Sequence, residues 1–276
     1  MEFYYLPKEY QVVHASCCEL VKQIEEFIVG PDYEFLWSSV FDLSESDVSL
    51  LSSYEDAFDY LKNHKEEHFY RVLNKQLVLG LLKDFCNFMQ ESLSCSTKMR
   101  LVVSYALLRR PLVDNLKILL RILSDDTFYD NFIEREDYDP SYIKDEDLKK
   151  YLEDTDGFRF TKSIKGSFIY ECIYDLSNAG SILNLSNRAL HPVTTRPKNR
   201  TGAMNCNFMF VTAKDNEELW RHYYAYLPVI LIFYSELFNS VVFALFQNEV
   251  NMDLYPKRLE KLANIMEYSV YPNSYK

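Results

Sequence analysis

The chain has 276 residues, 48% of them hydrophobic and 16% aromatic, so it can bury a sizeable core and is not a disordered polypeptide. Its formal net charge of -11 excludes binding to nucleic acid over the whole surface, because such binding is driven by Lys and Arg. Any contact with RNA or DNA must come from a local basic patch or from a partner. Only 6 glycines and 9 prolines are present, which is few for the many turns of a sheet protein, so we expect an all-α protein.

Apolar residues at helical spacing predict a series of long helices. Gly30 and Pro31 should end the first helix, and Ser44 or Ser46 should cap a short one. Pro111 should kink or split the helix expected at residues 98–123. Residues 94–97 read as a break and residues 205–212 as extended. The expected helices are 8–29, 53–90 (as one or two helices), 98–123, 168–190, 217–248 and 255–266, with short ones at 128–135 and 145–152.

These segments predict a helical bundle with an acidic, partly irregular insertion at residues 125–156, which are dense in Asp and Glu. We expect an N-terminal helical region, 1–95, to pack on a bundle core, 96–276. A single domain spanning 1–276 is the alternative.

The stretch from Tyr226 to Phe246 is long enough to cross a bilayer, but Glu236 and Asn239 fall in its middle. We therefore expect a buried core helix and no stable membrane insertion. The six cysteines form no CxxC pair, and the N-terminal residues do not form a secretory signal. Together these features favour reduced thiols and a cytoplasmic location.

A basic segment, 183–202, interrupts the helical pattern of this acidic chain. It contains His191, followed by Pro192, and the cations Arg188, Arg196, Lys198 and Arg200. A histidine can serve as acid or base near neutral pH, and arginines can hold a phosphate, so the segment suits RNA cleavage or binding. The simpler interpretation is a helix end whose basic residues pair with acidic surface elsewhere.

Three other groups of residues have spacings that could form sites. Arg110 and Asp114 are four residues apart beside Arg109 and should share a helix face. His64 and His68 have the spacing of metal ligands, but Lys65 stands where a zinc hydrolase needs Glu, and no third ligand is evident. Arg221 and His222 lie at the start of the last long helix, and His222 could face the loop that holds His191. Because no third ligand accompanies His64 and His68, we predict no metal site. The sequence also has no Gly-rich phosphate loop and no nucleophile elbow, and we predict no cofactor.

The order of features in residues 99–247 resembles bacterial all-helical proteins related to the HEPN superfamily. The likeness rests on the segments LLRRPLVDNLKILLRIL, 107–123, and LSNRALHP, 185–192, with an acidic excursion between them and a long apolar helix after them. The active-site motif of that superfamily is Arg, a polar residue, three residues and then His. Asn187 and His191 match the polar and His positions, whereas the Arg position falls on Ser186.

The resemblance implies a helical bundle, often a homodimer, that takes part in toxin–antitoxin or anti-phage defence as a metal-independent endoribonuclease. In this chain His191 would be the acid/base, with Asn187, Arg188 and Arg110 completing the catalytic set. Arg196, Lys198 and Arg200 would bind RNA. The alternative function is a non-catalytic binding or scaffold subunit of a complex with other defence proteins. A third possibility, a membrane-associated defence protein using residues 226–246, has less support.

Overall fold

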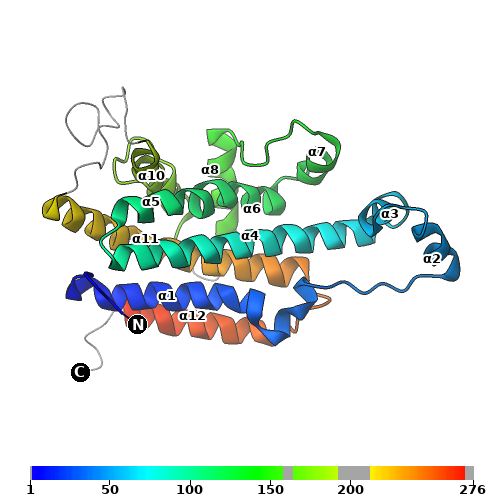
Figure 1. The fold of residues 1–276 in the computed structure, drawn as a ribbon, viewed down its shortest axis with the longest axis horizontal. Helices are drawn as coiled ribbons and strands as arrows, with labels where there is room; N and C mark the ends of the chain where they lie inside the picture. The colour runs from blue at the N-terminus through cyan, green and yellow to red at the C-terminus, as the bar shows by residue number, and fades with distance from the viewer. Residues whose placement is uncertain (1, 158–163, 192–211, 271–276) are drawn as a thin grey trace.

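The computed structural model describes residues 2–157, 164–191 and 212–270, and within them the chain forms α-helices and no strand (Figure 1). The all-α prediction is therefore confirmed. The first half contains α1 (Lys8–Val29), α2 (Glu45–Leu51), α3 (Ala57–His64), α4 (Glu66–Thr97), α5 (Leu101–Arg109) and α6 (Asn115–Ser124). The second half contains α7 (Phe128–Glu134), α8 (Asp145–Asp154), α9 (Gly166–Ile173), α10 (Ile182–Leu190), α11 (Ala213–Leu245) and α12 (Leu254–Val270).

The long helix α11 lies at the centre of the bundle, where it contacts α1, α4, α5, α9 and α12. Figure 1 shows α1 and α12 on one side of it and the α5–α6 pair on the other, with α8 and α10 beyond that pair. Thr212 begins α11 with a capping box in which its side chain accepts a hydrogen bond from the Asp215 N–H. The helix therefore begins at Ala213, four residues before the expected start at 217.

By length and composition, α11 is the described helix that could cross a membrane. In the fold, however, 78% of its most apolar window is buried by other parts of the chain. Glu236, in the middle of that window, is 1% exposed. The apolar surface of α11 is therefore used to build the core of the bundle.

One continuous apolar core joins all the long helices, from Leu6 near the N-terminus to Leu262 in α12. The acidic segment 125–156 contributes Phe128, Leu148 and Leu152 to this core, and α8 packs between α6 and α9. The insertion is thus acidic on its surface but anchored by apolar side chains.

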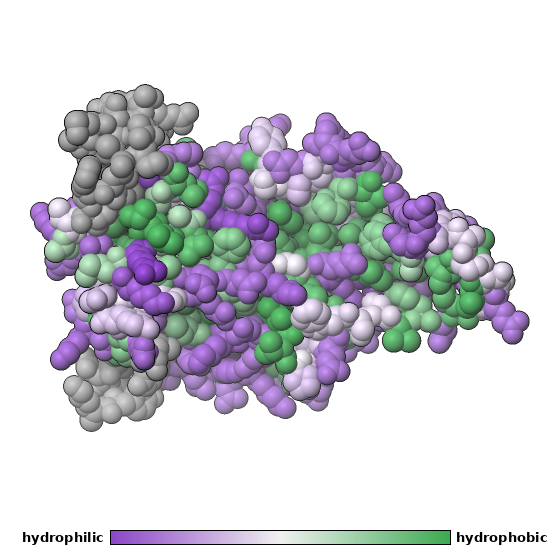
Figure 2. Space-filling model, in the orientation of Figure 1, coloured by the Kyte–Doolittle hydropathy of each residue, from purple (hydrophilic) through white to green (hydrophobic). Residues whose placement is uncertain are grey.

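A projecting arm, residues 37–65, contains α2 and α3, and α3 packs against the protruding N-terminal end of α4 (Figure 1). It has a small core of its own, formed by Tyr60, Leu61, Phe69 and Leu73. Apolar side chains are also exposed on the arm: Trp37, Val40, Val48 and Leu50. Figure 2 shows hydrophobic residues on the surface at the end of the molecule where the arm lies. With so small a core, the arm should open more readily than the bundle.

A π-helical turn, η2 (Arg110–Asp114), joins α5 to α6. The kink predicted at Pro111 takes this form because proline has no N–H for the normal helical hydrogen bond. Two buried tyrosines satisfy carbonyls of the turn: Tyr234 Oη donates to Pro111 O at 2.9 Å and Tyr174 Oη donates to Val113 O at 2.8 Å.

Two predicted helix boundaries are wrong. Residues 94–97 continue α4, because the Ser96 and Thr97 hydroxyls donate to carbonyls one turn back, at Leu93 and Ser94, and do not cap a new helix. The predicted helix 168–190 is instead α9 and α10 separated by a turn. There, Asp175 Oδ1 accepts from Ser177 N and Asn178 Oδ1 accepts from Gly180 N, which favours a turn over a helix.

Candidate functional site

Helix α10 carries the candidate motif and is held by capping at both ends. At its start, Ser181 Oγ accepts a hydrogen bond from Asn184 N, and the Asn184 amide donates to Leu176 O and Asn178 O in the preceding turn. At its end, His191 is the C-cap residue, and its N–H donates to Asn187 O at 3.1 Å. His191 is an exposed residue at the end of this helix, which packs on α5.

An arginine from α5 meets the motif at Asn187. Arg109 Nη1 donates to Asn187 Oδ1 at 2.6 Å, and Arg109 Nε lies 3.5 Å from Asp114 Oδ2. The contact joins residues 78 positions apart in the sequence. It places a guanidinium beside the polar position of the motif, one helical turn before His191.

The motif position that would hold Arg is filled by Ser186, which is 0% exposed and donates its hydroxyl to Leu183 O at 3.3 Å. An arginine at this position would place a charged group in the core, at a high desolvation cost. Packing therefore explains why a small residue stands here, and the cation in contact with Asn187 comes from another helix.

The structure does not bring Arg110 to the motif. Arg110 Nε donates to Asp84 Oδ2 on α4 at 2.7 Å, and its guanidinium lies 5.5 Å from the Phe88 ring centroid. The expected Arg110–Asp114 pair is also wrong, since Asp114 pairs with Arg109. The π turn causes both differences, because its i to i+5 hydrogen bonds place Asp114 one turn from Arg109.

Two more cations are half-buried: Lys117, which interacts with Asp114 and Arg109, and Arg188, which follows Asn187 in α10. Burial lowers the pKa of the Arg188 guanidinium. Burial also lowers the pKa of Lys117, against the opposing effect of Asp114, and Arg109 lowers it further. The Lys117 ammonium lies 5.7 Å from the centroid of the Tyr174 ring. The α10 site, which we define as Arg109, Asp114, Asn187, Arg188 and His191, thus combines an exposed histidine with partly desolvated arginines.

The predicted RNA-binding residues Arg196, Lys198 and Arg200 lie outside the described residues. The loop that His222 was expected to face continues from His191 into residues 192–211, which also lie outside the described residues. A Cβ atom added at Gly180 would lie 3.3 Å from His222 Nδ1, which places this histidine beside the turn that precedes α10.

His64 and His68 have separate partners. His64 Nε2 bonds to Tyr54 Oη at 2.6 Å, whereas His68 stacks on Phe41 with ring centroids 4.5 Å apart. Within residues 2–157, 164–191 and 212–270, no three His, Cys, Asp or Glu side chains are grouped as metal ligands.

A second polar group, which no sequence motif indicates, joins His14 and Cys18 of α1 to Tyr224 of α11. The spacing of four residues between His14 and Cys18 is the one signal that the sequence contains.

A scan against protein-family models finds no match to this chain, and searches of curated proteins and of solved structures find none either. Function is therefore inferred from the side chains and their arrangement.

Proposed function

We propose that the protein acts on RNA at the α10 site, as a HEPN-like component of a bacterial anti-phage or toxin–antitoxin system. The observation that carries the proposal is the 2.6 Å contact between Arg109 and Asn187. It supplies, from α5, a cation beside the polar residue of the motif, where the sequence itself has Ser186. The resemblance supports a metal-independent reaction. It also supports a homodimer, and light scattering would test that oligomeric state.

In the proposed reaction His191 takes the proton of a ribose 2′-hydroxyl, and the oxygen attacks the adjacent phosphorus. The 5′-oxygen leaves and takes a proton from the imidazolium. Histidine suits both steps because its charge changes near neutral pH. Arg109 and Arg188 would stabilise the negative charge that develops on the phosphate oxygens. Asn187 would act as a positioning residue, because its side-chain oxygen holds the Arg109 guanidinium.

One observation favours the second candidate, a non-catalytic RNA-binding or scaffold subunit. The Asp114 carboxylate lies 3.5 Å from Arg109 Nε and offsets part of the charge that a phosphate would meet. Because of this carboxylate, the site would bind RNA weakly. It would also stabilise the negative charge of a transition state less than a site without the carboxylate would.

The test is cleavage of a labelled RNA by the purified protein in excess EDTA, beside the same RNA with 2′-deoxy positions. His191→Ala should lower the cleavage rate about 100-fold or more, since general acid–base groups contribute this much. Arg109→Ala should lower it as well. Arg110→Ala is the matched control, because this neighbouring arginine faces α4 and should leave the rate unchanged.

Binding and toxicity separate the two candidates. RNA that is bound but left intact by the wild type and by His191→Ala would favour the binding subunit. Toxicity on expression that disappears in His191→Ala would favour the enzyme. Failure of the wild type both to cleave and to bind RNA would refute the proposal.

A further inference from the structure

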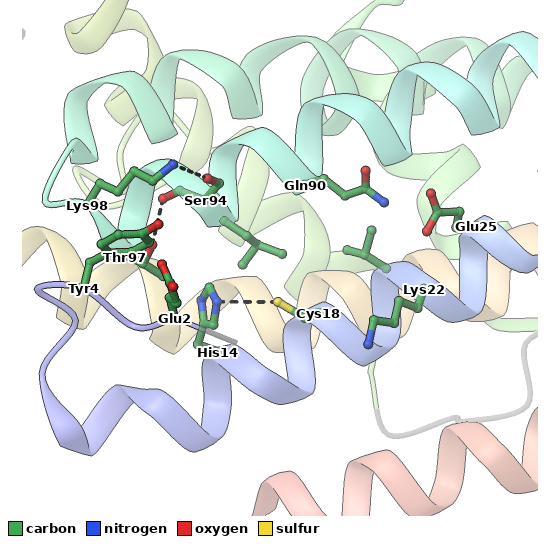
Figure 3. A pocket seen from close by; sticks show the side chains of 12 residues that line it. Glu2, Tyr4, His14, Cys18, Lys22, Glu25, Gln90, Ser94, Thr97 and Lys98 are labelled. Carbon is green, nitrogen blue, oxygen red and sulfur yellow. Dashed lines mark hydrogen bonds between the residues drawn. The ribbon is translucent and has the colours of Figure 1, made fainter.

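A cavity of about 400 Å³ lies between α1, the N-terminal segment and the last turns of α4 (Figure 3). Its wall contains both apolar and charged side chains, and it includes the imidazole of His14 and the thiol of Cys18. None of its residues belongs to the α10 site. A cavity of this volume falls in the range of small-molecule sites.

The thiol and the imidazole in this cavity face each other. Cys18 Sγ lies 3.5 Å from His14 Nε2, and the two residues are neighbours on consecutive turns of α1. His14 is only 3% exposed, whereas Cys18 is partly exposed. Figure 3 shows both side chains, joined by this contact, on the α1 side of the cavity. A small molecule in the cavity can therefore reach the sulfur but not most of the imidazole ring.

A chain of hydrogen bonds fixes which nitrogen of His14 carries the proton. Ser96 Oγ donates its single hydrogen to Leu93 O at 2.7 Å, so the 2.7 Å contact between Ser96 and Tyr224 must use the Tyr224 hydrogen. Tyr224 Oη then accepts from His14 Nδ1 at 2.8 Å. In a neutral ring this leaves the lone pair on Nε2, which accepts the S–H of Cys18.

Both groups rest uncharged at neutral pH. Burial lowers the pKa of His14 to about 4, and burial raises the pKa of Cys18 to about 11. A thiolate formed without help is scarce under these conditions, and the thiolate is the reactive form. An imidazole with this pKa is too weak a base to form a separate thiolate. The proton must therefore pass to Nε2 as the sulfur attacks, so that the charges on the ring and on the sulfur develop together and offset each other's burial.

Charged side chains around the same cavity suit a ligand that carries both carboxylates and an ammonium group. Lys98 donates to the Ser94 hydroxyl at 3.0 Å, so its positive charge has a neutral partner, and Lys22 pairs with Glu19 at the surface. Glu2 and Glu25 supply negative charge along the same wall. Figure 3 shows Lys98 and Lys22 at opposite ends of the cavity, with Cys18 between them.

We propose that Cys18 is a site of thiol–disulfide exchange with a small zwitterionic disulfide of the glutathione type. The Cys18 proton passes to His14 Nε2, and the sulfur attacks one sulfur of the disulfide. The S–S bond breaks with its electron pair on the leaving sulfur, which takes the proton from His14. Cys18 is oxidised to a mixed disulfide, and the other half of the small molecule is reduced to a thiol.

The experiment incubates the reduced protein with oxidised glutathione and maps the adducts by peptide mass spectrometry over time. The adduct should form on Cys18, and His14→Gln should slow its formation about tenfold or more through loss of the base. Cys95→Ser is the matched control, because it removes another partly exposed thiol and should leave the rate at Cys18 unchanged.

A second variant tests the pocket without touching the buried imidazole. Lys98→Ala should slow the reaction with glutathione disulfide several-fold but not the reaction with the uncharged 2-hydroxyethyl disulfide. Adducts on other cysteines with none on Cys18 would overturn the proposal. Equal rates of adduct formation at Cys18 in the wild type and in a folded His14→Gln variant would also overturn it. If that variant does not fold, equal rates with glutathione disulfide in the wild type and in Lys98→Ala would overturn it instead.

Discussion

The buried imidazole of His14 should make the stability of the fold depend on pH. Burial lowers its pKa from 6.5 to about 4, whereas the unfolded chain keeps the ordinary value. Below pH 6.5 the unfolded state therefore binds a proton that the folded state does not, so the free energy of unfolding falls as pH falls. The stability that the neutral His14 contributes is fully present above pH 6.5 and is lost by about pH 4. At about 1.4 kcal/mol for each pH unit, the loss is roughly 3 kcal/mol.

Urea unfolding of the wild type and His14→Gln, followed by circular dichroism from about pH 7 to about pH 4, measures this effect. Glutamine does not titrate, so the difference in unfolding free energy between the two proteins should shrink by roughly 3 kcal/mol over this range. Carboxylates and the other histidines titrate in both proteins and cancel. A difference that stays constant with pH would refute the neutral, buried state assigned to His14.

Three further predictions concern the packing of the bundle. Tyr234→Phe removes the donor to Pro111 O in the π turn and should lower the free energy of unfolding, measured in urea, by about 1–3 kcal/mol. No change would mean that water replaces the hydroxyl. Arg258→Leu removes the guanidinium that donates to the Asn239 side-chain oxygen and to the Gln23 carbonyl and so joins α12 to α11 and α1. It should lower the free energy of unfolding by roughly 3–5 kcal/mol, measured in the same way. Thr212→Ala removes the cap of α11 and should cost about 1 kcal/mol in thermal unfolding; a larger loss than from Arg258→Leu would contradict this order.

Helix positions could be predicted well from the sequence where apolar spacing and end chemistry agree. The first helix was expected at residues 8–29, the bounds that α1 has. The errors occur where polar side chains bond to nearby backbone. The Ser96 and Thr97 hydroxyls serve the interior of α4, whereas Asp175 and Asn178 stabilise a turn. The residue types are alike in the two segments, so composition alone does not distinguish a helix interior from a break.

Partners across helices could not be predicted, because periodicity shows which residues share a face but not what that face meets. Asn187 and His191 were named from the motif, whereas the arginine in contact with Asn187 is Arg109, and Arg110 contacts Asp84 instead. The π turn changes the register between α5 and α6, and no spacing rule based on 3.6 residues per turn anticipates this. The contact of His14 with Tyr224 spans 210 residues and is equally absent from any local pattern.

The position of Ser186 limits how an RNA-cleaving site could work in this fold. Since the side chain at 186 is buried, an arginine in the motif position is excluded, and the cation in contact with Asn187 is Arg109 of α5. If His191 and Arg109 act on one transition state, removing both should cost little more than removing His191 alone, because groups that act as a unit are not additive. Independent roles, such as RNA binding by Arg109 and helix capping by His191, would instead give additive losses. The double variant therefore distinguishes a single catalytic site from two unrelated features of the same surface.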